Sequence, residues 1–97
     1  MTTFAQRLVK LNEEFTPERK HIVTMKEIYK VAELLELDGM KEFDLRNLRD
    51  MTVMFFDSNA HSAREDGDWD AYDKAWDKMS AVTSVIDLEL KKHNHEV

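Results

Sequence analysis

One stretch of the chain, residues 69–92, places its large side chains at alternating steps of three and four residues. This spacing returns to one side of a helix on every turn, so it predicts a single long amphipathic helix. Small apolar residues widen the stripe on one flank, as a helix that faces a core requires. The stripe consists of Trp69, Tyr72, Trp76, Met79, Thr83, Ile86 and Leu90. We expect the rest of the chain to pack against this helix.

Apolar residues also recur at helical spacing earlier in the chain. The pattern predicts helices over residues 3–15 and 41–64. A polar break at residues 65–68 separates the second of these from the final helix, for which Asp68 is a good N-cap. The final helix is therefore expected over residues 68–92, with residues 93–97 as a frayed tail.

The segment 17–37 has two interpretations. Thr16-Pro17 is typical of a helix start, which makes the segment one long helix. A second start lies at Thr24, because Thr24 and Glu27 fit a capping box and predict a helix over residues 25–37. In both cases Asp38-Gly39 is expected to end the helix, since glycine readily takes the left-handed conformation.

Length and composition then indicate the fold class. A chain of 97 residues is the size of one domain, so we expect a single helical domain over residues 1–97. Two glycines and one proline leave little turn chemistry for sheets. Four helices with short turns predict an all-α fold, a compact antiparallel bundle of three to four helices. Its central hairpin is expected to be the helices over residues 41–64 and 68–92, the second of them a long C-terminal amphipathic helix.

Several classes of protein and site are excluded by what the sequence lacks. It has no cysteine, so a disulfide scaffold and thiolate metal sites are excluded. No apolar run approaches the roughly 20 residues that cross a bilayer, and the first residues lack the pattern of a signal peptide. We therefore expect a cytoplasmic protein with no membrane partner.

The negative charge of the chain is concentrated in one segment. The formal net charge is −6, and residues 57–77 hold seven acidic and two basic residues, a net of −5. The seven are Asp57, Glu65, Asp66, Asp68, Asp70, Asp73 and Asp77. A concentrated negative field repels nucleic acid and attracts basic surfaces, so direct nucleic-acid binding is not expected and a protein partner is favoured.

Four of these acids form a stripe beside the aromatic one. Asp66, Asp70, Asp73 and Asp77 follow one another at steps of four, three and four. One interpretation is a solvated helix start, where the helix dipole favours anions. The other is a docking face for a basic partner, with Trp69 as its aromatic anchor. Trp76, about two turns further into the helix, is expected to belong to the core.

The function that we predict is non-enzymatic binding. The chain is expected to be a small acidic module that docks on a basic, nucleic-acid-binding protein surface, as an inhibitor or modulator. The residues expected to bind are Asp66, Asp68, Trp69, Asp70, Asp73 and Asp77. Small size and acidity suggest the inhibitors that phages and mobile elements encode, a hypothesis that rests on no motif.

A helix-turn-helix DNA-binding regulator is the first alternative. The helix after Thr24, the turn at Asp38-Gly39 and a following helix with Arg46 and Arg49 have the required order. The same following helix also carries Glu42, Asp44 and Asp50, which phosphates repel. Nucleic-acid-binding domains are usually strongly basic, which this chain is not.

A magnesium-dependent enzyme is the second alternative. Glu33 and Glu36, together with Asp70 and Asp73, resemble the paired carboxylates of all-α nucleotide pyrophosphohydrolases. The fuller glutamate-rich motif of those enzymes is missing, and no glycine-rich phosphate loop accompanies the acids. The histidines are scattered along the chain, so neither a metal site nor a cofactor is expected.

The middle of the helix over residues 41–64 is apolar on most of its sides. Such a helix lies either at the centre of a bundle or at a subunit interface. One neighbouring helix does not cover so broad an apolar surface, which predicts a homodimer. The residues expected at its interface are Met51, Met54, Phe55 and Phe56.

Overall fold

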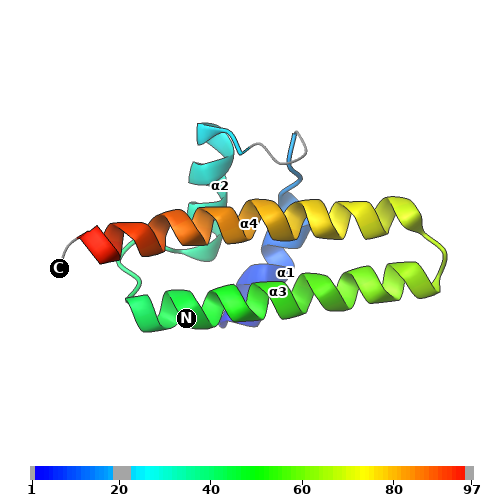
Figure 1. Cartoon of the computed structure of the whole chain (residues 1–97), viewed down its shortest axis with the longest axis horizontal. Helices are drawn as coiled ribbons and strands as arrows, with labels where there is room; N and C mark the ends of the chain where they lie inside the picture. The colour runs from blue at the N-terminus through cyan, green and yellow to red at the C-terminus, as the bar shows by residue number, and fades with distance from the viewer. Residues whose placement is uncertain (1, 19–22, 96–97) are drawn as a thin grey trace.

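The computed structural model describes residues 2–18 and 23–95, and these residues form four α-helices and no strand (Figure 1). Helix α1 spans Phe4–Glu14, α2 spans Met25–Leu35, α3 spans Glu42–Glu65 and α4 spans Trp69–His95. The prediction of an all-α bundle with a long C-terminal helix is confirmed.

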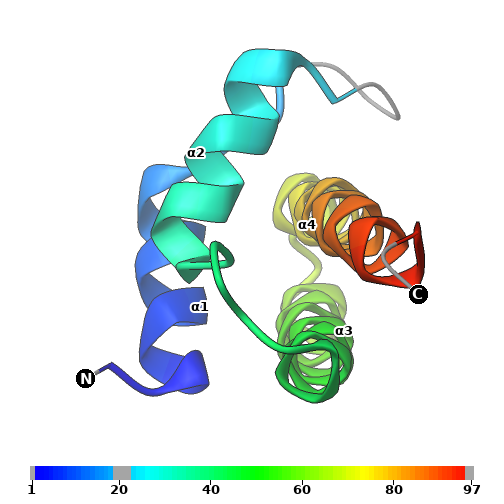
Figure 2. The same ribbon diagram turned by 90° about the vertical axis from the view of Figure 1, so that its left-hand side faces the viewer.

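Two antiparallel helix pairs make up the bundle. Helices α3 and α4 lie side by side along the longest dimension of the molecule, which is 47 Å (Figure 1). Helices α1 and α2 form the second pair, and they run across one side of the α3–α4 hairpin (Figure 2). The antiparallel neighbours follow from the short connections, whereas the two hairpins cross instead of sharing one axis.

The main core lies where the two hairpins cross. Its buried side chains come from all four helices and from one residue of each of the α1–α2 and α2–α3 connections. They are Leu8, Leu11, Phe15, Val31, Leu35, Leu37, Leu45, Leu48, Phe56, Ala81, Val82, Val85 and Ile86. Phe56 is fully enclosed, so its predicted place on a subunit interface is wrong. The side chain points inward because it shares a helical face with Leu45, Leu48 and Thr52.

The helix starts follow the capping patterns of the sequence. Thr24 lies in extended backbone, and its hydroxyl accepts a hydrogen bond from the N–H of Glu27 at 3.2 Å. Residues 23 and 24 are not helical, so one continuous helix over residues 17–37 is wrong and the second interpretation is confirmed. Residues 19–22, which the longer helix includes, lie outside the described residues. Thr3 and Gln6 form the same kind of box at the start of α1.

Two helix ends differ from the prediction. Helix α2 ends at Leu35, and Glu36 instead of Gly39 takes the left-handed conformation that stops it, with φ of 56°. The N–H of Leu37 then donates to the carbonyl of Ala32 at 3.0 Å, which completes a Schellman motif. This motif buries Leu37 in the core, and that burial offsets the cost of a left-handed glutamate. Helix α4 continues through His95, where a frayed tail was expected after residue 92.

Two cations each donate to a carbonyl at the C-terminal end of a neighbouring helix. Lys78 of α4 donates to the carbonyl and to the side-chain oxygen of Asn12, at 2.8 and 3.0 Å, near the end of α1. Arg7 of α1 donates to the carbonyl of Leu35 at 3.2 Å and pairs with Glu36 at 3.0 Å. Both contacts satisfy carbonyls that have no partner within their own helix. Burial, with a smaller effect of Lys74, lowers the pKa of Lys78.

A buried carboxylate joins the start of α2 to the segment that follows α1. Glu27 is only 5% exposed and accepts hydrogen bonds from the N–H of Glu18, the N–H of Thr24 and the Thr24 hydroxyl. Burial raises the pKa of this carboxyl, but the hydrogen bonds outweigh burial, so the pKa of Glu27 is lowered. The charged form of Glu27 therefore stabilises the connection between α1 and α2.

Replacement of this carboxylate gives a test of the connection. We expect Glu27→Gln to lower the free energy of unfolding at neutral pH by about 1–2 kcal/mol, because the amide loses one of the accepted hydrogen bonds. The folded-state pKa of Glu27 lies below its ordinary value of 4.5, so its contribution is present above that pH. The contribution is lost as the pH falls through the folded-state pKa. Urea unfolding followed by circular dichroism at neutral pH and at about pH 3 measures the difference.

Glu33→Gln is the matched control, because Glu33 lies on the same helix with an exposed side chain. The free energy of unfolding should be lower for Glu27→Gln than for Glu33→Gln at neutral pH, and the two values should become equal in acid. Equal stability of both variants at neutral pH would contradict the role given to Glu27.

Candidate functional site at the hairpin tip

The acidic segment occupies the end of the α3–α4 hairpin, which we call the hairpin tip and define as residues 57–78. Among the described residues, no member of the main core belongs to the tip. Figure 1 shows why, since α1 and α2 cross the hairpin on the side of the chain termini and leave the other end uncovered. Apart from the contact of Lys78 with Asn12 of α1, the tip is therefore held together by α3 and α4.

The turn at the tip is only three residues long. Gly67 takes the left-handed conformation with φ of 73°, and the N–H of Asp68 donates to the carbonyl of Ala63 at 2.9 Å. This Schellman motif ends α3. The Asp68 carboxylate then accepts a hydrogen bond from the N–H of Ala71 at 3.1 Å, which starts α4. The predicted N-cap at Asp68 is confirmed, and its side chain is thus already engaged within the chain.

Alanines form the buried contact between the two helices at the tip. Ala60, Ala63 and Ala75 are buried there, and such small side chains let two helices approach closely. Larger side chains of α4 cover the flank of this contact. Tyr72 and Trp76 line a small hollow of about 110 Å³ together with Asp57, Ala60, His61 and Arg64 of α3.

Three aromatic rings follow one another along the start of α4. The rings of Trp69 and Tyr72 are 5.5 Å apart, and those of Tyr72 and Trp76 are 6.0 Å apart, both in edge-to-face geometry. Trp76 is half-buried against α3 and lies outside the main core, so its predicted place in the core is wrong. The hollow beside this ring is lined by residues of α3 and α4. Trp69, at the outer end of the row, is 59% exposed.

The acidic stripe lies on the outer surface of the same helix. Asp70 and Asp73 are exposed, as is Asp66 in the turn, and Asp77 is half-buried. Asp70 pairs with Lys74 at 3.1 Å, and this is the one ion pair that the described part of the tip contains. Both partners are well exposed, so water screens the pair and its attraction is small. The structure therefore brings all six predicted binding residues to one end of the molecule.

The electrostatic consequence is a negative tip on a nearly balanced body. Residues 57–77 carry five of the six net negative charges of the chain. Lys78, the next cation along α4, donates into the carbonyl end of α1 and not toward the acids. The negative field of the tip therefore extends into solvent, where it attracts cations and repels anions.

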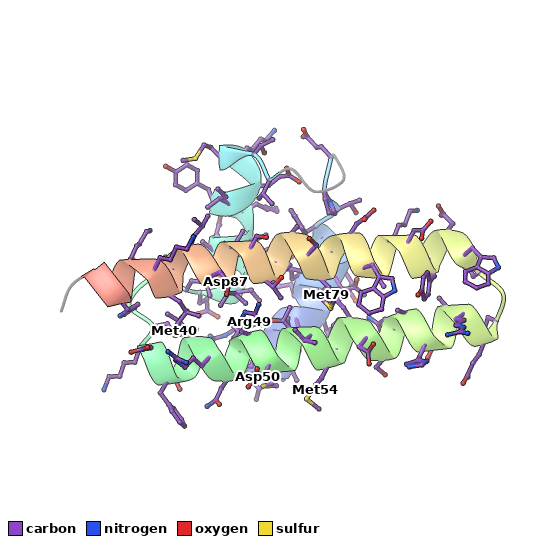
Figure 3. All side chains as sticks on the ribbon, viewed as in Figure 1. Met40, Arg49, Asp50, Met54, Met79 and Asp87 are labelled. Carbon is purple, nitrogen blue, oxygen red and sulfur yellow. The ribbon has the colours of Figure 1, made fainter. Side chains whose placement is uncertain are left out.

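The arginines of the helix-turn-helix alternative are engaged within the chain. Arg49 donates to Asp87 of α4 at 2.7 and 3.3 Å, a pair that joins the two long helices (Figure 3). The hydrogen bonds that Arg49 donates to Asp87 raise the pKa of Arg49, against the effect of burial. Arg46 pairs with Glu42 of its own helix at 2.8 Å. Neither side chain is free to contact phosphate without the loss of an internal partner.

The acids of the enzyme alternative lie far apart in the fold. Glu33 lies on α2 and Glu36 directly follows this helix, which crosses α4 in its C-terminal half (Figure 1). Asp70 and Asp73 instead lie in the first turns of α4, at the tip. Within residues 2–18 and 23–95, no group of three or more histidine and acidic side chains is placed to hold a metal ion.

The sequence analysis did not predict two features of the tip. The hollow beside Tyr72 and Trp76 depends on which turn of α3 faces which turn of α4, and a single-helix pattern does not contain that register. The sequence pattern assigned no partner to Lys78, yet its side chain donates to the end of α1. Its position beside the apolar stripe was the available signal, but the carbonyl that it meets comes from a residue 66 positions away.

Comparison of the chain with known protein families, with curated proteins and with solved structures gave no match. Within the described residues, no helix combines the length and the apolar character that a bilayer span requires. The interpretation of the tip accordingly rests on its own geometry and charge.

The two tryptophans should contribute differently to stability. Trp76→Ala is expected to lower the free energy of unfolding by about 2 kcal/mol, because it removes a half-buried ring from the α3–α4 contact. Trp69→Ala should cost at most about 1 kcal/mol, since only its edge contact with Tyr72 is lost. Urea unfolding of the two variants measures both values. A larger loss for Trp69→Ala would show that Trp69 is a structural residue and not a free surface anchor.

Proposed function

We propose that this chain is a small non-enzymatic binding module whose hairpin tip docks on a basic protein surface. One observation carries the proposal: an exposed tryptophan stands beside a dense group of exposed carboxylates, at an end of the molecule that no other helix covers. The contact residues are Asp66, Asp68, Trp69, Asp70, Asp73 and Asp77.

The charge of the tip supports an electrostatically steered encounter. Within the tip, only Asp70 of the four stripe aspartates has a compensating cation, so Asp66, Asp73 and Asp77 remain available to lysine and arginine side chains of a partner. Attraction between opposite surface fields raises association rates and selects against acidic partners. A nucleic acid does not fit this surface, because its phosphates carry the same sign.

The exposed ring of Trp69 supports an apolar anchor within the charged surface. Trp69 is 59% exposed, so a partner that covers it would bury a large part of its apolar surface. Its edge contact with Tyr72 holds the ring in place before binding, which lowers the entropy lost on association. Charge would thus guide the encounter and the ring would provide much of the final affinity.

The class of partner follows from the same chemistry. Strongly basic protein surfaces commonly serve to bind nucleic acid. An acidic module that covers such a surface competes with the nucleic acid for it. We therefore place the protein among inhibitors or modulators of nucleic-acid-binding proteins, and the phage or mobile-element origin of such inhibitors is the corresponding hypothesis for its source.

A pull-down at low and high salt tests the proposal. The tagged chain should capture a basic protein at low salt, and the capture should weaken steeply as the ionic strength rises above about 0.15 M. A variant with Asp66, Asp70, Asp73 and Asp77 all changed to Asn should lose the capture, and it keeps the Asp68 cap. Trp69→Ala should weaken binding to the identified partner by about tenfold or more.

The matched control removes the same charge elsewhere. Glu13, Glu14, Glu33 and Asp38 are exposed and lie outside the tip. Changing Glu13, Glu14 and Glu33 to Gln and Asp38 to Asn alters the net charge equally and should leave binding intact. Equal loss in both variants would show an effect of net charge alone. Binding that survives in the tip variant or at high salt would exclude the tip as the docking face.

A further inference from the structure

The chain contains the dipeptide Asp-Gly twice. Asp38-Gly39 lies between α2 and α3, and Asp66-Gly67 lies between α3 and α4. All four residues are exposed. Glycine has no Cβ to shield its backbone nitrogen, so an aspartate that precedes glycine is especially prone to react with that nitrogen. The reacting atoms are the same in both pairs, and a difference in reactivity between them therefore reflects the structure around each pair.

The reaction is an intramolecular rearrangement of the main chain. The glycine nitrogen forms a bond to Cγ of the aspartate, and the bond from Cγ to one carboxyl oxygen breaks. That oxygen leaves as water together with the proton of the glycine nitrogen, and a succinimide ring remains. Water then adds to either ring carbonyl, which restores aspartate or gives isoaspartate, whose main chain runs through the side-chain carbon. The overall change consumes neither an oxidant nor any other reactant.

Hydrogen bonds hold the glycine nitrogen at the hairpin tip. The N–H of Gly67 donates to the carbonyl of Arg64 at 3.1 Å, and the N–H of Asp68 donates to the carbonyl of Ala63 at 2.9 Å. The peptide unit between Asp66 and Gly67 must turn before the glycine nitrogen can reach the carboxyl carbon. That rotation breaks both hydrogen bonds, so the Schellman motif that ends α3 opposes the reaction.

The glycine nitrogen between α2 and α3 has no such restraint. The N–H of Met40 donates to the carbonyl of Leu37 at 3.0 Å, which closes a turn with Asp38 and Gly39 at its central positions. Gly39 has φ of 77°, a value that glycine adopts without strain. Among the described residues, no backbone hydrogen bond uses the N–H of Gly39. Rotation of the reacting peptide unit therefore breaks one hydrogen bond here, against two at the tip.

We propose that Asp38-Gly39 is a site of spontaneous covalent modification, at which the folded protein converts aspartate to isoaspartate, while Asp66-Gly67 is protected. One additional hydrogen bond contributes about 1 kcal/mol, so residue 38 should react at least about fivefold faster than residue 66. The proposal does not depend on the function of the hairpin tip.

The modification changes the connection between α2 and α3. Isoaspartate adds one carbon to the main chain between Leu37 and Gly39. Leu37 is only 1% exposed and Met40 packs against the core, so both ends of the turn are fixed. The longer connection does not fit between these fixed ends without distortion. We therefore expect the modified chain, separated by chromatography, to unfold at a lower urea concentration than the unmodified chain.

Peptide mapping of the aged protein tests the site. After prolonged incubation of the folded chain at physiological temperature, proteolysis and mass spectrometry with electron-based fragmentation distinguish isoaspartate from aspartate at each position. Isoaspartate should accumulate at residue 38, and at residue 66 at least about fivefold more slowly. Incubation in guanidinium chloride is the control, because both turns are then unfolded and the two rates should become comparable. Equal rates in the folded chain, or no product at residue 38 while the unfolded chain forms it, would overturn the proposal.

A matched pair of variants gives a second readout. Asp38→Asn and Asp66→Asn form the same succinimide ring with ammonia as the leaving group, and hydrolysis then raises the mass of the intact chain. In the folded state Asp38→Asn should gain mass at least about fivefold faster than Asp66→Asn, and in guanidinium chloride the difference should disappear. Circular dichroism shows that both variants are folded at the start. Equal rates of the two folded variants would contradict the protection assigned to the Schellman motif.

Discussion

The packing of α3 against α4 is the contact on which the rest of the structure depends. These two helices are 24 and 27 residues long, and they supply most of the main core. The three-residue turn around Gly67 makes them antiparallel neighbours, and the ion pair between Arg49 and Asp87 joins them in the half of the hairpin that lies away from this turn. Helices α1 and α2 pack across one side of this long hairpin, and their buried leucines complete the core on that side.

The difference in helix length creates the candidate site. Helices α1 and α2 have 11 residues each, so they cover only part of the longer hairpin. Beyond that cover, alanines hold α3 and α4 together and the larger side chains lie at the surface. Acidic residues there have few cations nearby, and water is their main source of solvation. An exposed tryptophan and an extended negative field are both consequences of this uncovered end.

Polar contacts join the short helices α1 and α2 to each other, and α1 to the long helix α4. Lys78 and Arg7 each donate to the carbonyl end of a neighbouring helix, and Glu27 accepts hydrogen bonds at the start of α2. In each case a group that would be costly to bury alone meets a backbone group that its own helix leaves unpaired. These contacts help to orient α1 and α2 on the hairpin.

The sequence by itself determined the helices, two capping boxes, the tight turn before α4 and the concentration of charge near it, because these features depend on residues only a few positions apart. Only the tertiary structure decided that the two hairpins cross, that Phe56 is buried while Met54 is exposed, and that Trp76 lies beside the core and not within it. A helical pattern shows which residues share a face. It does not show how far along a helix its neighbours extend, because that depends on where segments distant in the sequence meet.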